Sequence, residues 1–315
     1  MKKALPLLFS FCFLALLIGR PHNSHTAGPE SKYRFLTADP NARDYWPCFS
    51  PDGKTVLFSR STDQGKTWEL FVILSSGGQA RRLSADRLPV SANRPNWSAK
   101  NNLIAFTGES SDGGASVWLI NGDGTQPRRI APSDLSNRVL YPSWYPDGNR
   151  LAVVDRGAGG GGVIKQIDLK NRTATPLTDP QQVLAGMPSV SPDGRWVAFA
   201  GQKNQGQAYD QTKNSIWLVG DAGKPQLLEP DQGRTPAWSP DGRWLAFESD
   251  RGNLNHLYAV FIINRSGKGL NQVTPYELNA NHPVWSPDGK LLVFSARHSE
   301  SQDATGIAII EAPKP

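Results

Sequence analysis

The sequence contains very little cysteine. Its 315 residues include only Cys12 and Cys48, and Cys12 lies in an apolar run at the N-terminus. If that run is removed as a leader, Cys48 remains alone and no intrachain disulfide can form. The mature domain must then hold itself together by packing, and we expect Cys48 to be a buried small residue.

Long hydrophobic runs are also scarce. One run follows Met1-Lys2-Lys3 and extends over the 16 residues from Ala4 to Gly19. A bilayer span needs roughly 20 apolar residues, so a positive start with this short core predicts a signal peptide over residues 1–27. An uncleaved anchor is the alternative, and it would be the only contact with a membrane. Residues 28–315 would form the mature domain, with a periplasmic or secreted location.

Neither strong charge nor a catalytic motif is present. Removing Lys2, Lys3 and Arg20 with the leader lowers the formal net charge from +6 to +3, without the clustered basic stripe of a nucleic-acid binder. The sequence has no Gly-x-Ser-x-Gly, His-Glu-x-x-His or Cys-x-x-Cys pattern. The histidines outside the leader, His256, His282 and His298, are too scattered to predict a metal site. We therefore expect no catalytic residues and no bound cofactor.

A glycine run, Gly157–Gly162, formally satisfies the dinucleotide-binding pattern Gly-x-Gly-x-x-Gly. That chemistry requires a helix N-terminus after the glycines, whereas the segment that follows, "VIKQIDL", alternates like a strand. The run is better interpreted as the tip of a hairpin.

The dominant feature is a repeated phrase, of which "PAWSPDGRWLAFE" is one copy. Six copies begin at Pro47, Pro95, Pro142, Pro188, Pro236 and Pro283. Their spacings of 48, 47, 46, 48 and 47 residues indicate one supersecondary unit repeated along the chain. Each unit is predicted to form four short strands. The first carries the aromatic residue, and a Pro-Asp-Gly turn joins it to an apolar second strand. An alternating third strand and a short fourth strand follow.

Four antiparallel strands repeated six times predict an all-β fold, a six-bladed β-propeller. The aromatic residue of each copy, such as Trp238, should pack between adjacent blades. The sixth copy ends without a fourth strand, while residues 33–39, "YRFLTAD", match that strand's pattern. We therefore expect the N-terminal strand to join the last blade and close the ring, which leaves no open edge.

The phrase P-x-W-S-P-D-G-x-x-L-A-F resembles the propeller repeat of the TolB family over residues 33–315. The resemblance implies a periplasmic propeller that binds cell-envelope proteins such as a peptidoglycan-associated lipoprotein and other Tol partners. TolB proteins also have an N-terminal α/β domain, for which this sequence has no room. TolB-like propellers can place a cation, such as calcium, in the central channel, but its ligands are not identifiable here.

A second motif keeps a carbohydrate-related alternative open. "STDQGKTW", from Ser61 to Trp68, fits the Asp-box of sialidases and related propellers, and a degenerate copy ends at Trp118. In those families the box stabilises a hairpin, with the aspartate bonding the turn backbone, and we favour that structural interpretation. A carbohydrate-binding or carbohydrate-active propeller, similar to a sialidase or an oligogalacturonate lyase, remains the alternative.

The candidate binding site is the mouth of the central channel. If the first strand of each blade is innermost, residues just before each repeat proline surround one opening, on the face of the loops joining the second and third strands. Aromatic and arginine side chains are frequent in binding hot spots. The predicted partner-binding residues are Tyr45, Trp46, Asn93, Arg94, Tyr141, Arg234, Asn281 and His282. The main hypothesis is a monomeric, exported, non-catalytic propeller that binds a protein of the cell envelope at this mouth.

Overall fold

The computed structural model describes residues 33–313, apart from residues 85, 87, 89, 131, 133, 158–160, 222, 230 and 299–303. The predicted leader, residues 1–27, therefore lies outside the described part. In the described residues the secondary structure is 24 strands and two short 3-10 helices, η1 (Gln211–Lys213) and η2 (Tyr276–Leu278). No helix among the described residues is long and apolar enough to cross a membrane.

The six copies of the repeat supply four kinds of strand, in the predicted order. The first strands are β2 (Arg43–Phe49), β6 (Ser91–Trp97), β10 (Val139–Trp144), β14 (Val183–Val190), β18 (Arg234–Trp238) and β22 (Asn281–Trp285). The second strands are β3 (Thr55–Ser61), β7 (Leu103–Glu109), β11 (Arg150–Asp155), β15 (Trp196–Lys203), β19 (Trp244–Ser249) and β23 (Leu291–Arg297).

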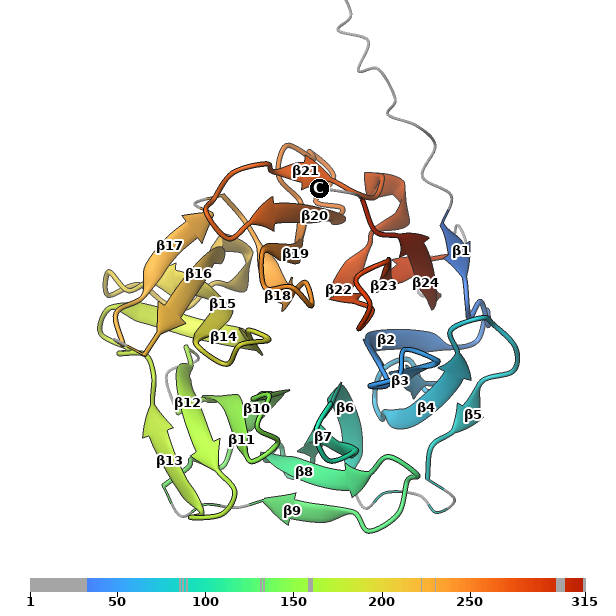
Figure 1. The fold of residues 1–315 in the computed structure, drawn as a ribbon, viewed down its shortest axis with the longest axis horizontal. Helices are drawn as coiled ribbons and strands as arrows, with labels where there is room; N and C mark the ends of the chain where they lie inside the picture. The colour runs from blue at the N-terminus through green and yellow to red at the C-terminus, as the bar shows by residue number, and fades with distance from the viewer. Residues whose placement is uncertain are drawn as a thin grey trace, which may run out of the picture. The chain divides into compact units, whose positions relative to one another are not determined.

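The third strands are β4 (Glu69–Leu74), β8 (Ala115–Asn121), β12 (Val163–Asp168), β16 (Ser215–Gly220), β20 (Ala259–Asn264) and β24 (Thr305–Glu311). The last strands are β5 (Arg81–Arg82), β9 (Arg128–Ile130), β13 (Thr173–Pro176), β17 (Gln226–Glu229) and β21 (Asn271–Gln272). Figure 1 shows these strands arranged around a centre, with the first strands innermost.

The hydrogen bonds group the strands into five sheets. Four sheets have four strands each, in the orders β6-β7-β8-β9, β10-β11-β12-β13, β14-β15-β16-β17 and β18-β19-β20-β21. The fifth has eight strands and combines the first and sixth copies of the repeat. These two halves are joined by one parallel residue pair, Arg43 with Thr305. The fold is therefore an all-β propeller, in which five hydrogen-bonded sheets stand where the repeat count predicts six.

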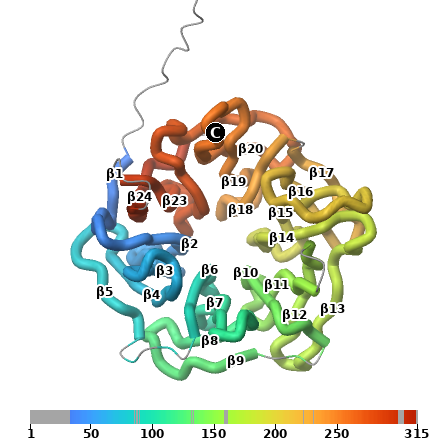
Figure 2. The backbone as a smooth tube through the Cα atoms, turned by 180° about the vertical axis from the view of Figure 1, so that it is seen from behind, coloured from blue at the N-terminus to red at the C-terminus, as the bar shows by residue number. Residues whose placement is uncertain are grey.

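The N-terminal strand is shorter than predicted. Only β1, Arg34–Phe35, is a strand, and it pairs antiparallel with β24, with Arg34 opposite Ile309. The views from both sides of the ring place it beside β24 (Figures 1 and 2). The contact continues for two residues because the Leu36 N–H donates to the Ile307 carbonyl at 2.7 Å and Thr37 Oγ1 accepts from the Ile307 N–H at 2.8 Å. Residues 38 and 39 leave the sheet edge.

The Ser-Pro-Asp-Gly turn is stabilised by its serine as well as by its last three residues. Ser50 Oγ donates to Asp52 at 2.7 Å and accepts the Thr55 N–H at 3.0 Å, and Gly53 takes a φ of +71°. The same bonds recur in the turns at Ser191, Ser239 and Ser286. A hydroxyl that both donates and accepts ties the two strands of each hairpin together at the turn.

In the described residues the core consists of six apolar clusters, each shared by neighbouring copies. Trp238 is 7 % exposed and packs with Ala198 of the preceding copy, and its Nε1 donates to the Ser189 carbonyl at 3.0 Å. The sixth cluster combines Phe49 and Phe58 of the first copy with Val293 and Ile307 of the last. The predicted position of the repeated aromatic residues between copies is confirmed. Cys48 is buried and free, and burial raises the pKa of its thiol to about 12.

Candidate functional site

The innermost strands share an unusual backbone conformation just before each repeat proline. The six residues at this position have φ angles between +47° and +57°: Trp46, Arg94, Tyr141, Met187, Thr235 and His282. Each stands where the register between the first and second strands shifts, as between Tyr45 and Cys48. Non-glycine residues rarely take positive φ, and such outliers concentrate at functional sites.

These six residues, which we call the pre-proline ring, line a central cavity of about 460 Å³. Its wall continues along the repeat prolines to turn residues such as Pro51, Pro146 and Pro240. Because Arg43 pairs with Ser61 and Phe49 with Val56, these turns lie at the opposite end from the loops joining the second and third strands. The cavity therefore extends towards the turn end, whereas the sequence predicts the mouth at the loop end.

A larger depression, of about 600 Å³, lies between turns of the fourth and fifth copies and is lined by polar residues such as Asp193 and Arg243. Both belong to exposed turns, and their carboxylates and guanidinium groups are engaged locally, as Arg243 is with Asp241 at 2.7 Å. The central cavity is the stronger candidate, because apolar walls combined with a few placed polar groups are typical of ligand sites.

The structure brings four of the eight predicted residues to the cavity wall: Trp46, Arg94, Tyr141 and His282. The other four, each one residue earlier in its strand, are not among the residues that line this cavity. Asn93, for example, is buried and accepts a hydrogen bond of 2.6 Å from Arg94 Nη1. Tyr45 packs edge-on against His282, with ring centroids 5.7 Å apart.

Aromatic rings narrow the channel at the level of the pre-proline ring. The centroids of Trp46 and Trp68 lie 4.8 Å apart, and those of Trp46 and His282 lie 5.6 Å apart. The Arg94 guanidinium lies over both Trp46, at 4.7 Å, and Tyr141, at 4.4 Å. Four copies of the repeat thus contribute to one group of contacting side chains, in which Trp46 and Tyr141 hold the arginine in place by cation–π contacts.

A buried carboxylate that is not among the residues predicted from the sequence organises the other side of the pre-proline ring. Glu248 is fully buried and receives hydrogen bonds from Arg234 Nε at 3.0 Å, Thr235 Oγ1 at 2.7 Å and the His282 N–H at 2.7 Å. Burial raises the pKa of this carboxyl, but the charge of Arg234 and these hydrogen bonds outweigh it, so the pKa is lowered. Glu248 therefore stays ionised and forms an ion pair with the guanidinium of Arg234.

His282 is neutral at physiological pH. Burial is the main cause that lowers its pKa to about 4, and the positive charges of Arg234 and Arg94 lower it further, against the opposing effect of Glu248. The accessible part of the His282 side chain lines the central cavity. A neutral imidazole here packs against Trp46 without adding a third positive charge.

The Asp-box folds as a hairpin device, in agreement with its structural interpretation. Asp63 accepts hydrogen bonds from Ser61 Oγ at 2.7 Å, the Thr67 N–H at 2.9 Å and Thr67 Oγ1 at 2.6 Å. These bonds, with that from Thr67 first, lower the pKa of the carboxyl. Its degenerate copy uses Asp112 in a similar way, with bonds from Ser110 and the Gly114 N–H. Trp68 ends the box and packs edge-on against Trp46.

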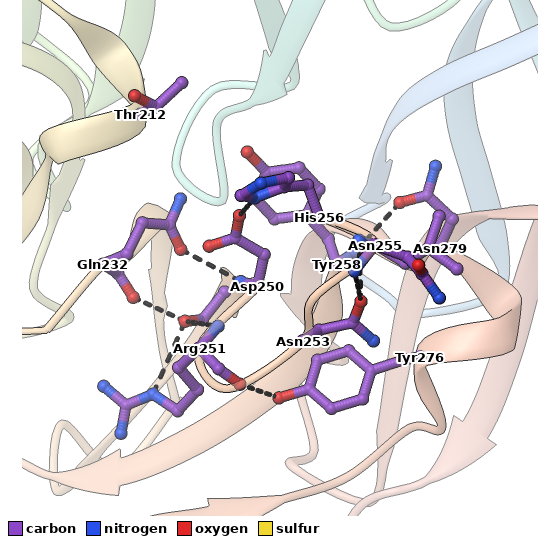
Figure 3. Close-up of polar contacts among 12 residues, drawn as sticks. Thr212, Gln232, Asp250, Arg251, Asn253, Asn255, His256, Tyr258, Tyr276 and Asn279 are labelled. Carbon is purple, nitrogen blue, oxygen red and sulfur yellow. Dashed lines mark hydrogen bonds and ion pairs between the residues drawn. The ribbon is translucent and has the colours of Figure 1, made fainter.

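The loop between β19 and β20 is held by its own polar network (Figure 3). The Asp250 N–H donates to Gln232 at 3.0 Å, and the Asp250 carboxylate contacts His256 Nδ1 at 3.1 Å. Tyr276 donates its hydroxyl hydrogen to the Arg251 carbonyl. These contacts stabilise the loop at the end of the ring away from the turns, and they leave His256 largely exposed.

The other sequence motifs contribute no site. Within the described residues no group of three or more histidine, cysteine, aspartate or glutamate side chains is placed to hold a metal. His298 packs against Phe35 of β1, whereas His282 packs against Tyr45 and Trp46. The glycine run leads into β12, a strand, as expected for a hairpin and not for a dinucleotide site; residues 158–160 of the run lie outside the described part.

The fold is a β-propeller with a cavity at its centre. A family model, the TolB beta propeller domain, matches residues 30–225. The chain belongs to this family. No curated protein matches it.

Solved structures resemble the chain in fold at low identity. The putative TolB from Agrobacterium tumefaciens is 19% identical, with a TM-score of 0.66 over 89% of this chain and 94% of that one. TolB from Acinetobacter baumannii is 18% identical, with a TM-score of 0.58 over 87% of this chain and 64% of that one. An oligogalacturonate lyase from Vibrio parahaemolyticus is 13% identical, with a TM-score of 0.56 over 92% and 95%. Identities this low show the shared fold alone.

Proposed function

We propose that this chain is a non-catalytic propeller that binds a segment of a protein partner in its central channel. The observation that carries the proposal is the cavity of about 460 Å³, whose wall is built from all six innermost strands. Its volume falls within the range of roughly 300–1,000 Å³ typical of ligand sites. Trp46, Arg94, Tyr141 and His282 would touch the partner, while Tyr45, Asn93, Arg234 and Asn281 would hold them in position.

The partner is proposed to be a protein of the cell envelope. Membership of the TolB propeller family supports this choice, together with the short apolar run after Lys2-Lys3 that predicts export. The chain would then act outside the cytoplasm, as a monomer whose ring presents the cavity to the partner.

The ring is proposed to have six blades closed by the N-terminal strand. The eight-stranded sheet divides naturally into two blades, since only the pair Arg43–Thr305 joins its halves. With β1 added as its outermost strand, the last blade gains the fourth strand that the repeat lacks there. The cluster that joins Phe49 to Val293 provides the corresponding apolar interface.

The closure can be tested by a change at Gly306. A Cβ atom at this position would lie 2.1 Å from the Thr37 carbonyl oxygen. Gly306→Val should therefore displace the N-terminal strand from β24 and expose residues 33–37 to limited proteolysis. Gly157→Val is the control, because nothing lies within 4 Å of a Cβ there. Equal protease resistance of both variants would contradict closure by this strand.

The binding function can be tested by obstructing the cavity without disturbing the core. Ala99 is exposed and lines the cavity, so Ala99→Trp places a large side chain at the turn end. Lys54→Trp is the control, since Lys54 is an exposed turn residue outside the lining. In pull-downs from envelope extract, a partner captured by the wild type and the Lys54 variant should be lost with Ala99→Trp. Capture that is equal in all three would refute the channel as the binding site.

The Asp-box, which motivated the carbohydrate alternative, gives it little support. The Asp63 carboxylate already accepts three intramolecular hydrogen bonds in its turn, so it is not displayed for a ligand. What favours the alternative is the arginine between two aromatic rings, since acidic sugars also carry carboxylates. A direct binding measurement with digalacturonate distinguishes the two, as described below.

A further inference from the structure

Two arginines near the innermost strands are each paired with a carboxylate of the same chain. Arg60 Nε and Nη2 donate to the two oxygens of Asp44, both at 2.7 Å, and Asp44 is fully buried. Arg234 Nε and Nη2 lie 3.0 and 2.7 Å from Glu248 Oε1. In both cases an internal carboxylate occupies the edge formed by Nε and Nη2, the geometry of strong arginine–carboxylate pairs.

Arg94 has the same edge without an internal carboxylate. Its Nη1 donates to Asn93 at 2.6 Å and lies 3.4 Å from Glu109, a long contact with a half-exposed carboxylate. Its Nε is buried, and no acceptor lies within hydrogen-bond distance of it in the described part of the chain. A buried donor left without an acceptor lowers stability, so an incoming oxygen that bonds it is favoured.

The surroundings hold the Arg94 side chain at the cavity wall. Trp46 and Tyr141 cover the two faces of the guanidinium, at 4.7 and 4.4 Å from their ring centroids, so the charge is held in one plane. Two residues of the wall, His282 and Trp285, also have a buried nitrogen, Nδ1 and Nε1, that lacks a hydrogen-bond partner among the described residues. Trp285 differs in this from Trp238, whose Nε1 bonds the carbonyl of the preceding copy.

We propose that the Arg94 guanidinium binds a carboxylate carried by the partner, so that the channel selects an acidic peptide segment. The carboxylate takes the place at Arg94 that Asp44 takes at Arg60 and Glu248 takes at Arg234. The proline- and tryptophan-lined wall of the cavity covers the apolar part of the same segment. This inference rests on the proposed function, because it names what the partner offers to the channel.

The test uses 3-phenylpropionate as the smallest probe with a carboxylate and an apolar body, and 3-phenylpropanamide as its uncharged match. Each is titrated into the 15N-labelled full chain while the arginine Nε–Hε resonances are followed, with that of Arg94 assigned by its loss in Arg94→Lys. The carboxylate should shift the Arg94 Hε resonance in a saturable manner, and the amide should not. This comparison within the wild type does not depend on how well a variant folds.

The variants then measure the specificity of the contact. Arg94→Lys keeps the charge but loses the two-pronged edge, and it should weaken 3-phenylpropionate binding at least about tenfold. Arg243→Lys is the matched control, since Arg243 is an exposed turn arginine outside the cavity lining, and it should bind as the wild type does. Equal weakening in both variants, or no weakening in Arg94→Lys, would overturn the assignment.

Digalacturonate provides the last arm. If it shifts the Arg94 resonance at lower concentration than 3-phenylpropionate, the carboxylate belongs to an acidic sugar and the peptide assignment is wrong. If no carboxylate probe shifts Arg94 while Ala99→Trp still abolishes partner capture, the channel binds a protein by other contacts. In that case this inference fails and the proposed function survives.

Discussion

Trp238 offers the clearest measure of how the propeller is held together. Its indole is 7 % exposed and packs in a cluster with Leu245, Phe247 and Phe261 of its own copy and with Ala198 of the preceding one. Truncating a buried aromatic side chain to alanine typically destabilises a protein by about 3–5 kcal/mol. Trp238→Ala also leaves the Ser189 carbonyl without its donor, so we expect the upper part of this range.

The assay is urea unfolding at 25 °C, supported by thermal unfolding. A loss of this size should lower the melting temperature by about 6–15 °C in a chain of this length. Trp238→Phe separates the two causes, because it removes the hydrogen bond but keeps an aromatic ring, and it should lose less than half as much stability. Leu254→Ala is the surface control, since Leu254 is 95 % exposed and its truncation should change stability by less than about 0.5 kcal/mol.

The result that would refute the reasoning is a loss below about 1 kcal/mol for Trp238→Ala, with an unchanged dependence on urea. The indole would then contribute little to the contact between the fourth and fifth copies. Packing between copies would have to depend on the aliphatic residues of the second and third strands instead.

Three further outcomes are expected. Asp44→Asn leaves Arg60 without its buried counter-ion and should cost about 3–5 kcal/mol in urea unfolding, whereas a loss below 1 kcal/mol would show that the pair is dispensable. Ser239→Ala removes the hydroxyl that accepts the Trp244 N–H and should cost about 1–2 kcal/mol, with no effect expected at exposed serines. The lowered pKa of His282, about 4, means that the unfolded chain binds a proton that the folded chain refuses between pH 6.5 and 4. Stability should therefore fall as the pH falls through this window, by up to about 3 kcal/mol, and His282→Gln should flatten that slope; an unchanged slope would exclude His282 as its cause.

The repeat made much of the fold predictable. Its spacing and its Pro-Asp-Gly turns defined the strand order within each copy, because turn chemistry and apolar alternation are local properties of the sequence. The position of Trp238 between copies followed from the same repetition. The length of the N-terminal strand was harder to predict, because the residue at which β1 ends depends on the contact between Thr37 and β24.

The site was predictable in composition but not in geometry. Counting back from the repeat prolines identified Arg94 and Tyr141, yet nothing in the residues marks positive φ at positions occupied by tryptophan, arginine and tyrosine. Glu248 was missed because its importance comes from Arg234 and His282, which reach it only in the folded ring. The sequence held one local signal for Glu248. The second strand of each copy has a phenylalanine or its equivalent, and Glu248 is the only acidic residue that directly follows it; other copies have Ser59 or Thr107 there.

The six positive φ angles of the pre-proline ring have a consequence for evolution and design. A non-glycine residue in such a conformation costs about 1–3 kcal/mol, so six of them together are comparable to the entire net stability of a typical domain. Glycine would relieve this cost at every position, yet none of the six is glycine. Glycine would also remove the side chains that line the cavity and hold Glu248 and Arg94, so the backbone cost is the condition for presenting side chains at these six points of the channel.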